Sequence, residues 1–205
     1  MADYTAIYET GNALVEMFRD ALTPEPVSKR EAISLCSPYE NDNNSLTVHL
    51  FHVEEDRQNG VPRYVSVGQD RMEMEPTQIH AYFIVTAHSS APLQVREADT
   101  YRIIGAAIQA ISDSPVLDAK YLVGSVAAEE TRLTASVENY DMEKMQKIWN
   151  NPQVPYKASI VVKVSGISID SKRSVKISRV MDAEFAVQQK SSMQQKSSMQ
   201  QKSSI

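Results

Sequence analysis

The side chains best suited to acid–base or metal chemistry are four histidines and one acidic cluster. They are His49, His52, His80 and His88, and the run Glu54, Glu55 and Asp56. His49 and His52 stand three residues apart in a strand-like stretch, so we expect them on opposite faces, where they cannot share a metal ion. His80 and His88 share a strand face but lie about 26 Å apart. We therefore expect satisfied or surface histidines, and a solvated strand end for the acids.

The remaining reactive residues form no recognised catalytic or ligand-binding motif. Cys36 is the single cysteine, which excludes an internal disulfide and an all-cysteine metal site, and we expect it to be a small buried hydrophobe. The six glycines form no phosphate-binding loop, and there is no serine nucleophile elbow, Cys-x-x-Cys or His-Glu-x-x-His pattern. The sequence thus predicts no catalytic residue, no metal site and no cofactor, and the protein is not expected to be an enzyme.

Composition is that of an ordinary globular chain. Its 205 residues fit one domain, and 42% of them are hydrophobic and 23% charged. The net charge of −5 argues against nucleic-acid binding. No apolar run approaches the ~18 residues of a membrane span, and the first residues lack the pattern of a signal peptide. We expect synthesis in the cytoplasm and no direct membrane insertion.

A repeat separates the last residues from the rest of the chain. Residues 188–205 read QQKSSM, QQKSSM, QQKSSI, and one apolar residue in six cannot offset the entropy of ordering such a segment alone. The repeat contains three lysines and no acid, so the remaining chain carries −5 − 3 = −8. We predict a domain over 1–187 and a tail over 188–205 that is disordered or ordered only in an assembly. Lys190, Lys196 and Lys202 are its candidate contacts with a partner or with the lumen of a ring.

Hydrophobic periodicity predicts a body of alternating helices and strands. Helices are expected over 3–22, over 96–112 and in a short segment that follows Asn139 as its cap, with Trp149 in the core. Strands are expected in AISLCSP, SLTVHLFHVEED, RYVSV, TQIHAYFIVTAHS, TRLTASVENY, ASIVVKVSGISID and SVKISRVMDAEF. Asn59-Gly60 predicts a hairpin between the second and third of these strands, and the change of apolar parity at Gly166 predicts a β-bulge.

The helix over 96–112 carries two apolar stripes. One comprises Tyr101, Ile104, Ile108 and Ile111, which we expect to face the sheet. The second comprises Ile103, Ala107 and Ala110, with Gly105 nearby. A mid-helix glycine costs about 1 kcal/mol relative to alanine, which suggests a close neighbouring backbone. The second stripe should face either another element of the same chain or the next subunit, so Ile103, Gly105, Ala107 and Ala110 are the candidate subunit interface.

The order of these segments resembles the cap, or tail-terminator, proteins of extracellular contractile injection systems, which are antifeeding-prophage-like relatives of contractile phage tails. The resemblance spans roughly 5–180 and rests on Ile104-Gly105, on the run from Asp113 to Leu117, and on the helix ending in Trp149 before a hydrophobic strand. His88 departs from the family, which has an aromatic residue there, and the repeat tail lies outside the family pattern.

The resemblance implies a single α/β (α+β) domain with a mixed, largely antiparallel sheet flanked by helices. It also implies a homohexameric ring on the distal end of the tube and sheath, which stops polymerisation and fixes particle length without a cofactor. Its partners would be the sheath and inner-tube proteins, and assembly would occur in the cytoplasm, on a particle later released or membrane-tethered. The strand over 158–169 or that over 173–180 could accept a sheath arm at its edge.

Two other functions are compatible with the sequence. One is a small α/β enzyme whose site the fold assembles from dispersed histidines and carboxylates, which would require a deep polar pocket around His49, His80 or His88. The other is an adaptor that anchors a larger particle through the tail.

Overall fold

A computed structural model of the chain describes residues 3–39, 43–56, 63–67, 71–128, 132–149 and 155–176. The α-helices are α1 (Ala6–Leu22), α2 (Leu93–Asp113), α3 (Gly124–Ala128) and α4 (Met142–Ile148). The strands are β1 (Ile33–Leu35), β2 (Leu46–Glu55), β3 (Tyr64–Ser66), β4 (Arg71–Met74), β5 (Thr77–Ala87), β6 (Thr134–Glu138), β7 (Ser159–Ile169) and β8 (Ser174–Lys176). The predicted Asn59-Gly60 turn and the tail lie outside the described residues.

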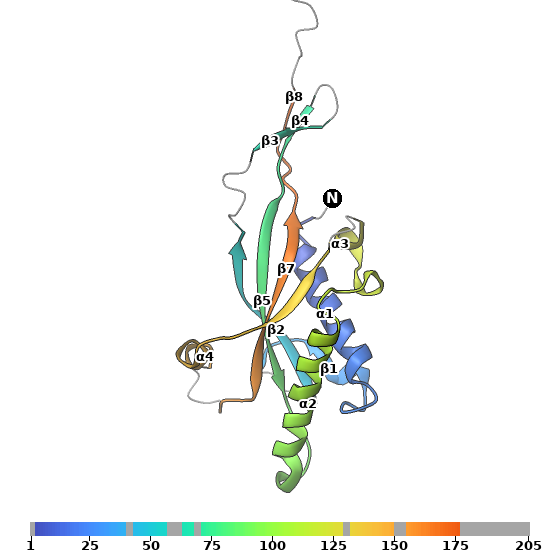
Figure 1. Ribbon diagram of the computed structural model, residues 1–205, viewed down its shortest axis with the longest axis vertical. Coiled ribbons are helices and arrows are strands. Elements are labelled where there is room, and N and C mark those ends of the chain that lie inside the picture. Colours follow the sequence, from blue (N-terminus) through green and yellow to red (C-terminus); the bar gives the residue numbers. More distant parts are fainter. Residues whose placement is uncertain are drawn as a thin grey trace, which may run out of the picture.

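The main sheet has five strands in the order β1-β2-β5-β7-β6, with β1 parallel to β2 and every other pair antiparallel. Helices α1 and α2 cover one face of this sheet and α4 lies on the other (Figure 1). This arrangement confirms the predicted mixed, largely antiparallel sheet flanked by helices. Because β7 lies between β5 and β6, the strand over 158–169, one of the two candidate edge strands, is an inner strand.

A large hydrophobic core lies between the main sheet and the helices α1 and α2. Leu14, Phe18 and Leu22 of α1 are fully buried, since they recur on one side of the helix. A smaller cluster on the other face joins Ile84 to Trp149, which confirms Trp149 as a core residue.

Two local predictions need correction. Helix α4 begins after Asp141, whose carboxylate accepts a hydrogen bond from the Glu143 amide at 3.3 Å, so Asp141 rather than Asn139 is its cap. Cys36 is half-buried rather than buried, and its Sγ lies 3.2 Å from Ser34 Oγ. In both cases a nearby polar side chain supplies a hydrogen bond that hydrophobic patterning does not reveal.

Gly166 forms the predicted bulge in β7. Ile79 pairs with Ile167, but Ala81 pairs with Val164, so β7 carries one extra residue at this point. Gly166 has φ of 89°, and a Cβ there would lie 2.6 Å from the carbonyl oxygen of Arg132. Glycine is therefore required both by the backbone conformation and by the close neighbouring chain.

A second sheet of three strands, in the order β3-β4-β8, extends the fold at one end of its long axis (Figure 1). β4 leads into β5, and β8 follows β7, so the second sheet continues two inner strands of the first. The prediction that β3 forms a hairpin with β2 is wrong, because β3 pairs with β4. β8 is the described part of the strand predicted over 173–180, and it is an edge strand of this small sheet.

Candidate functional site

His88 is buried in a hydrogen-bond network. Its Nε2 lies 2.9 Å from Thr47 Oγ1, and its Nδ1 lies 3.1 Å from Lys157 Nζ. The same ammonium donates to the carbonyl oxygen of Pro38 at 3.3 Å. Burial, and secondly the charge of Lys157, lowers the pKa of His88 to about 4, and burial also lowers the pKa of Lys157. The prediction of a satisfied histidine is confirmed at this position.

His52 and His80 meet the acidic cluster in an open groove of about 890 Å³ beside β2 and β5. Its lining comprises His52, Val53, Glu54, Glu55, Asp56, His80 and Lys163. Asp56 lies 3.7 Å from His80 Nε2, and the Tyr82 hydroxyl donates to Glu54 at 2.9 Å. Burial, followed by this hydrogen bond, raises the pKa of Tyr82 to about 12. Among the described residues no group of three or more His, Cys, Asp or Glu is placed to hold a metal ion.

A bulge in β2 overturns the prediction that His49 and His52 lie on opposite faces. β2 pairs His49 with Ile84 and His52 with Tyr82, with a shift of register around Phe51. Ile84 and Tyr82 are two residues apart and therefore share a face of β5. Their cross-strand partners share that face as well. The extra residue thus brings both histidines to the α4 side of the sheet.

Helix α2 buries the stripe of smaller residues together with one edge of the stripe that its larger side chains form. Ile103 and Ala107 are buried in the core of the same chain, as are Ala110 and Ile111. Tyr101 is 64% exposed and Ile108 is 38% exposed, so the prediction that this stripe faces the core is wrong for these two residues. It is confirmed for Ile111, which is buried, and for Ile104, which packs against the core. Small residues are needed on the buried side because α1 packs against α2 there.

This orientation bears on the candidate subunit interface. The side chains of Ile103, Ala107 and Ala110 are buried in the core of their own chain. Of the two partners expected for the second stripe, this is the element of the same chain. Gly105 lies on the exposed side, and a Cβ at this position would meet nothing within 4 Å. Any contact of a partner with this helix would therefore be made through Gly105 and its exposed neighbours.

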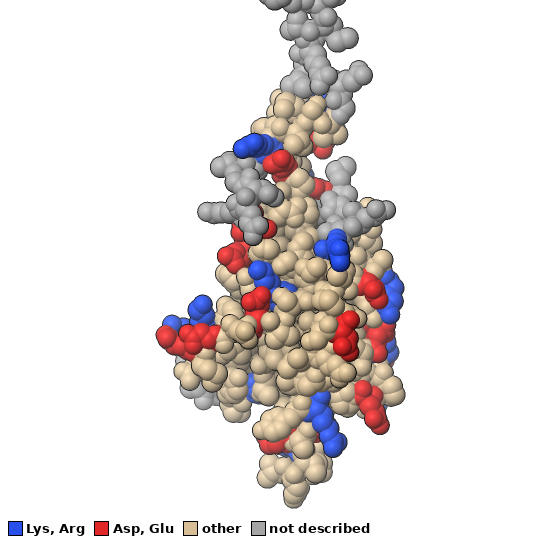
Figure 2. Space-filling model, in the orientation of Figure 1, with Lys and Arg blue, Asp and Glu red and all other residues tan. Residues whose placement is uncertain are grey.

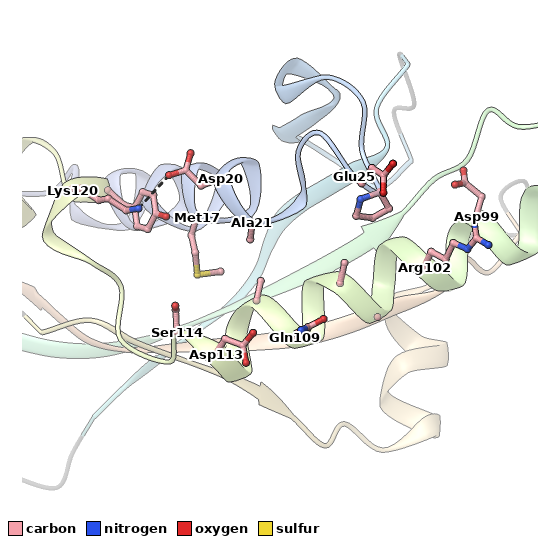
Figure 3. A pocket seen from close by; sticks show the side chains of 15 residues that line it. Met17, Asp20, Ala21, Glu25, Asp99, Arg102, Gln109, Asp113, Ser114 and Lys120 are labelled. Carbon is pink, nitrogen blue, oxygen red and sulfur yellow. Dashed lines mark ion pairs between the residues drawn. The ribbon is translucent and has the colours of Figure 1, made fainter.

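A groove of about 1020 Å³ runs between α1 and α2 (Figure 3). We call it the α1–α2 groove. Its α2 wall includes Asp99, Arg102, Gly105, Gln109 and Asp113. The opposite wall includes Met17, Asp20 and Ala21 of α1 and Glu25 and Pro26 of the turn after this helix. Lys120 also lines it and lies 3.4 Å from Asp20. The groove has carboxylates at both ends of its α2 wall, and Met17, Ala21 and Ala110 add apolar surface to its lining. This arrangement suits an extended basic segment better than a small polar substrate.

The small sheet has one apolar and one polar face. Cross-strand pairs join Tyr64 to Met74 and Met72 to Val175, so these four side chains share one face. We call this set the apolar tip face. Tyr64 and Val175 are 40% and 47% exposed. Figure 1 shows the small sheet at one end of the long axis, with α2 and α4 toward the other end. The alternation in RMEM, with methionine at every second residue, is the sequence signal that could have revealed this strand.

Charged side chains do not form a single-sign surface on the face shown in Figure 2. Lysine and arginine are interspersed with acids, and α4 carries both signs, with Lys147 paired to Glu143 at 2.8 Å. A large nucleic-acid footprint would instead need clustered positive charge. No helix in the described ranges is long and apolar enough to cross a membrane.

The fold is that of a tail terminator. Over 95% of this chain it is similar, with a TM-score of 0.62 and 13% identity, to the sheath/tube terminator of PVC, an extracellular contractile injection system, in its extended state. It is also similar, over 87% of the chain and with a TM-score of 0.52 and 12% identity, to the tube-terminating cap of the anti-feeding prophage. This chain spans 67% and 60% of the lengths of those two chains.

The family model described as the Pvc16 N-terminal domain matches residues 9–182. The chain therefore belongs to the Pvc16 N-terminal domain family, which confirms the resemblance to contractile-injection-system terminators. No curated protein matches the sequence.

Proposed function

We propose that this protein is a structural cap, which forms a ring on the distal end of the tube and sheath of a contractile injection system and so stops their polymerisation. The observation that carries this function is the terminator fold over 95% of the chain, together with membership of the Pvc16 N-terminal domain family. The ring is a homohexamer, and its partners are the sheath and inner-tube proteins of the same particle.

The described surfaces suit such a role physically. A ring subunit needs two different faces that cyclic symmetry brings together, and this chain has an exposed side of α2 and a separate apolar tip face. An apolar tip at one end of an elongated subunit can contact a second protein while the helices contact neighbouring copies. Residues 1–187 form the cap domain and 188–205 a separate tail.

The cap acts without catalysis or a cofactor, and without nucleic acid or insertion into a membrane. The histidines support this assignment, because His88 is kept neutral in a buried network, while His80 and Asp56 line an open groove. Assembly takes place in the cytoplasm, on a phage tail-like particle.

The test is to measure the mass of the purified chain by light scattering and to image it by negative stain, then to add it to polymerising tube and sheath. A closed six-fold ring and a shorter, narrower distribution of particle lengths are expected. A monomer that neither binds tube or sheath ends nor changes particle length would overturn the proposal.

A further inference from the structure

The α1–α2 groove is a concave surface whose charges call for a basic partner. Four acids and two basic residues line it. One of the basic residues, Lys120, is already paired with Asp20 at 3.4 Å. Asp113 is exposed at one end of the α2 wall, and Asp99, which accepts a hydrogen bond from Ser89, stands at the other (Figure 3).

The two aspartates have a defined spacing. They are 14 positions apart in α2, which is about 21 Å along the helix axis and within about 40° of four full turns. Asp99 and Asp113 therefore lie on the same side of the helix, at the two ends of one wall.

The tail matches this spacing. Its lysines recur every six residues, which in an extended chain is about 20 Å, and an even spacing places them on the same side. Lys190 and Lys196, or Lys196 and Lys202, can thus reach Asp99 and Asp113 together. In such an extended segment the intervening methionine, three residues from each lysine, would point the opposite way, toward the wall that carries Met17 and Ala21.

Arg102, three residues from Asp99 on the α2 wall, also fits this partner. Arg102 lies between the two aspartates along α2 and would repel a lysine. The glutamine pairs that precede each lysine offer amide oxygens, which a guanidinium can use as hydrogen-bond acceptors. The absence of a side chain at Gly105 leaves room for a backbone to approach the helix.

We propose that the α1–α2 groove binds the QQKSSM-repeat tail, residues 188–205, of a neighbouring copy of this chain. The groove lies beside α2, whereas β8, from which the chain continues toward the tail, lies at the opposite end of the long axis (Figure 1). A tail donated to the next subunit would form a repeated head-to-tail contact, and the many contacts of a closed ring strengthen one another. The identity of the neighbour as a ring subunit rests on the proposed function.

Binding is tested with a fluorescein-labelled peptide of residues 188–205 and the full-length chain carrying Lys190→Gln, Lys196→Gln and Lys202→Gln, whose own tail cannot compete electrostatically. Fluorescence anisotropy at low salt should show saturable binding that salt weakens. Adding Asp99→Asn and Asp113→Asn to this chain should weaken binding by roughly tenfold, as expected for the loss of two ion pairs at the protein surface.

A matched control carries Glu54→Gln and Glu55→Gln, which remove two charges from the other acidic groove and should change the affinity by less than about twofold. Charge reversal provides a second check: Asp99→Lys with Asp113→Lys should bind a peptide in which the three lysines are glutamate. Binding unchanged by Asp99→Asn and Asp113→Asn, binding lost in the Glu54 and Glu55 control, or no binding at all would overturn the proposal and leave the tail for the lumen or another partner.

The source of the tail is tested on the unaltered full chain. An equal mixture of ¹⁴N- and ¹⁵N-labelled protein is treated with a carbodiimide, which joins a lysine to a nearby carboxylate, and the products are identified by mass spectrometry. Cross-links that join a tail lysine of one isotope to Asp99 or Asp113 of the other are expected. Cross-links confined to one isotope would overturn donation between copies. Since neither experiment contains tube or sheath, their outcome is independent of whether the protein caps a particle.

Discussion

At the scale of single residues, the proton on the buried His88 ring is fixed by its two neighbours. The Lys157 ammonium can only donate, so Nδ1 of His88 must keep its lone pair at the 3.1 Å contact. The ring proton therefore lies on Nε2, which donates to Thr47 Oγ1 at 2.9 Å. Burial disfavours the charged ring, and a second proton would also face the Lys157 ammonium, so the pKa of His88 is lowered to about 4.

The His88 network predicts a loss of stability in mild acid. The folded pKa of about 4 lies below the ordinary value of 6.5, so protons bind the unfolded chain first. The free energy of unfolding is at its full value above pH 6.5 and falls by roughly 3 kcal/mol as the pH drops toward 4. Urea denaturation across this range should show the loss, and His88→Gln should flatten it. An identical pH profile for the variant would contradict the assignment.

Two glycines should respond to alanine in opposite directions. Gly166→Ala places a Cβ 2.6 Å from a backbone oxygen at φ of 89°, and it should lower the free energy of unfolding by roughly 2 kcal/mol or more. Gly105→Ala adds a Cβ in open space within a helix, and it should raise the free energy of unfolding by about 0.5–1 kcal/mol. Thermal and urea denaturation of both variants measure the two changes. An unchanged or higher free energy of unfolding in Gly166→Ala would show that the bulge tolerates a side chain, and a lower one in Gly105→Ala would show that the exposed side of α2 does not.

At the scale of elements, Glu9 joins α1 to α3. Its carboxylate accepts hydrogen bonds from Ser125 Oγ at 2.8 Å and from the Val126 amide at 3.0 Å, and from Thr5 Oγ1 at 2.8 Å. Burial alone would raise the pKa of Glu9, but these hydrogen bonds outweigh it and the pKa is lowered. Helix α3 has five residues, too few to be stable alone, so its position depends on contacts with the rest of the chain, which are this carboxylate and the core around the buried Val126.

Removing the Glu9 carboxylate should therefore release α3. Glu9→Ala is expected to increase amide hydrogen exchange at Val126 at least about tenfold, because a hydrogen bond to a charged group stabilises by roughly 1.5–3 kcal/mol. Glu16→Ala, also on α1 but paired with Arg19 and Arg30, is the matched control and should leave exchange at Val126 unchanged. Unchanged exchange in Glu9→Ala would show that core packing of Val126 suffices.

The apolar tip face should matter for binding rather than for folding. Tyr64→Ser with Val175→Ser is expected to change the free energy of unfolding by less than about 1 kcal/mol, because both side chains are 40% or more exposed. The same pair should weaken binding to tube or sheath ends, measured by co-sedimentation. Val65→Ser is the matched control, since Val65 is equally exposed, at 40%, but lies on the polar face. Equal loss in the control would show that the face is not specific.

Which segments form helices and which form strands was predictable from the sequence. Which strands pair with one another, and which side of a helix is buried, was less predictable. The strand TQIHAYFIVTAHS and the bulge at Gly166 follow from alternation and parity, which are local signals. The pairing of β3 with β4 instead of β2 depends on contacts remote in sequence. The buried side of α2 was predicted from its larger side chains. Ala107 and Ala110 are buried instead, because α1 packs closely against this side of the helix. Residues from three separate segments line the α1–α2 groove, so the spacing of residues within one segment could not predict it.

At the scale of the whole molecule, charge is divided between an acidic body and a basic tail. The chain carries −5 in total, and the tail contributes three lysines and no acid. Contacts between the two parts of neighbouring copies should be sensitive to salt, whereas contacts between apolar faces should not.

Deleting residues 188–205 should consequently leave ring formation intact but reduce its sensitivity to salt. Light scattering of the full and shortened chains at low and high salt measures the copy number in each case. Raising the salt concentration should lower the copy number of the full chain more than it lowers the copy number of the shortened chain. If the shortened chain fails to form the ring that the full chain forms in the same buffer, the tail is needed for closure itself.

The continuation of β4 into β5 and of β7 into β8 has a mechanical consequence. Both connections leave the main sheet at the same end, and they enter strands that lie in its interior. A pull on the small sheet along the long axis is therefore carried along the strands, so that the hydrogen bonds of β5 with β2 and β7 share the load in shear instead of opening one by one. A subunit held by its tip would resist a sudden axial force far better than one held through a peripheral loop.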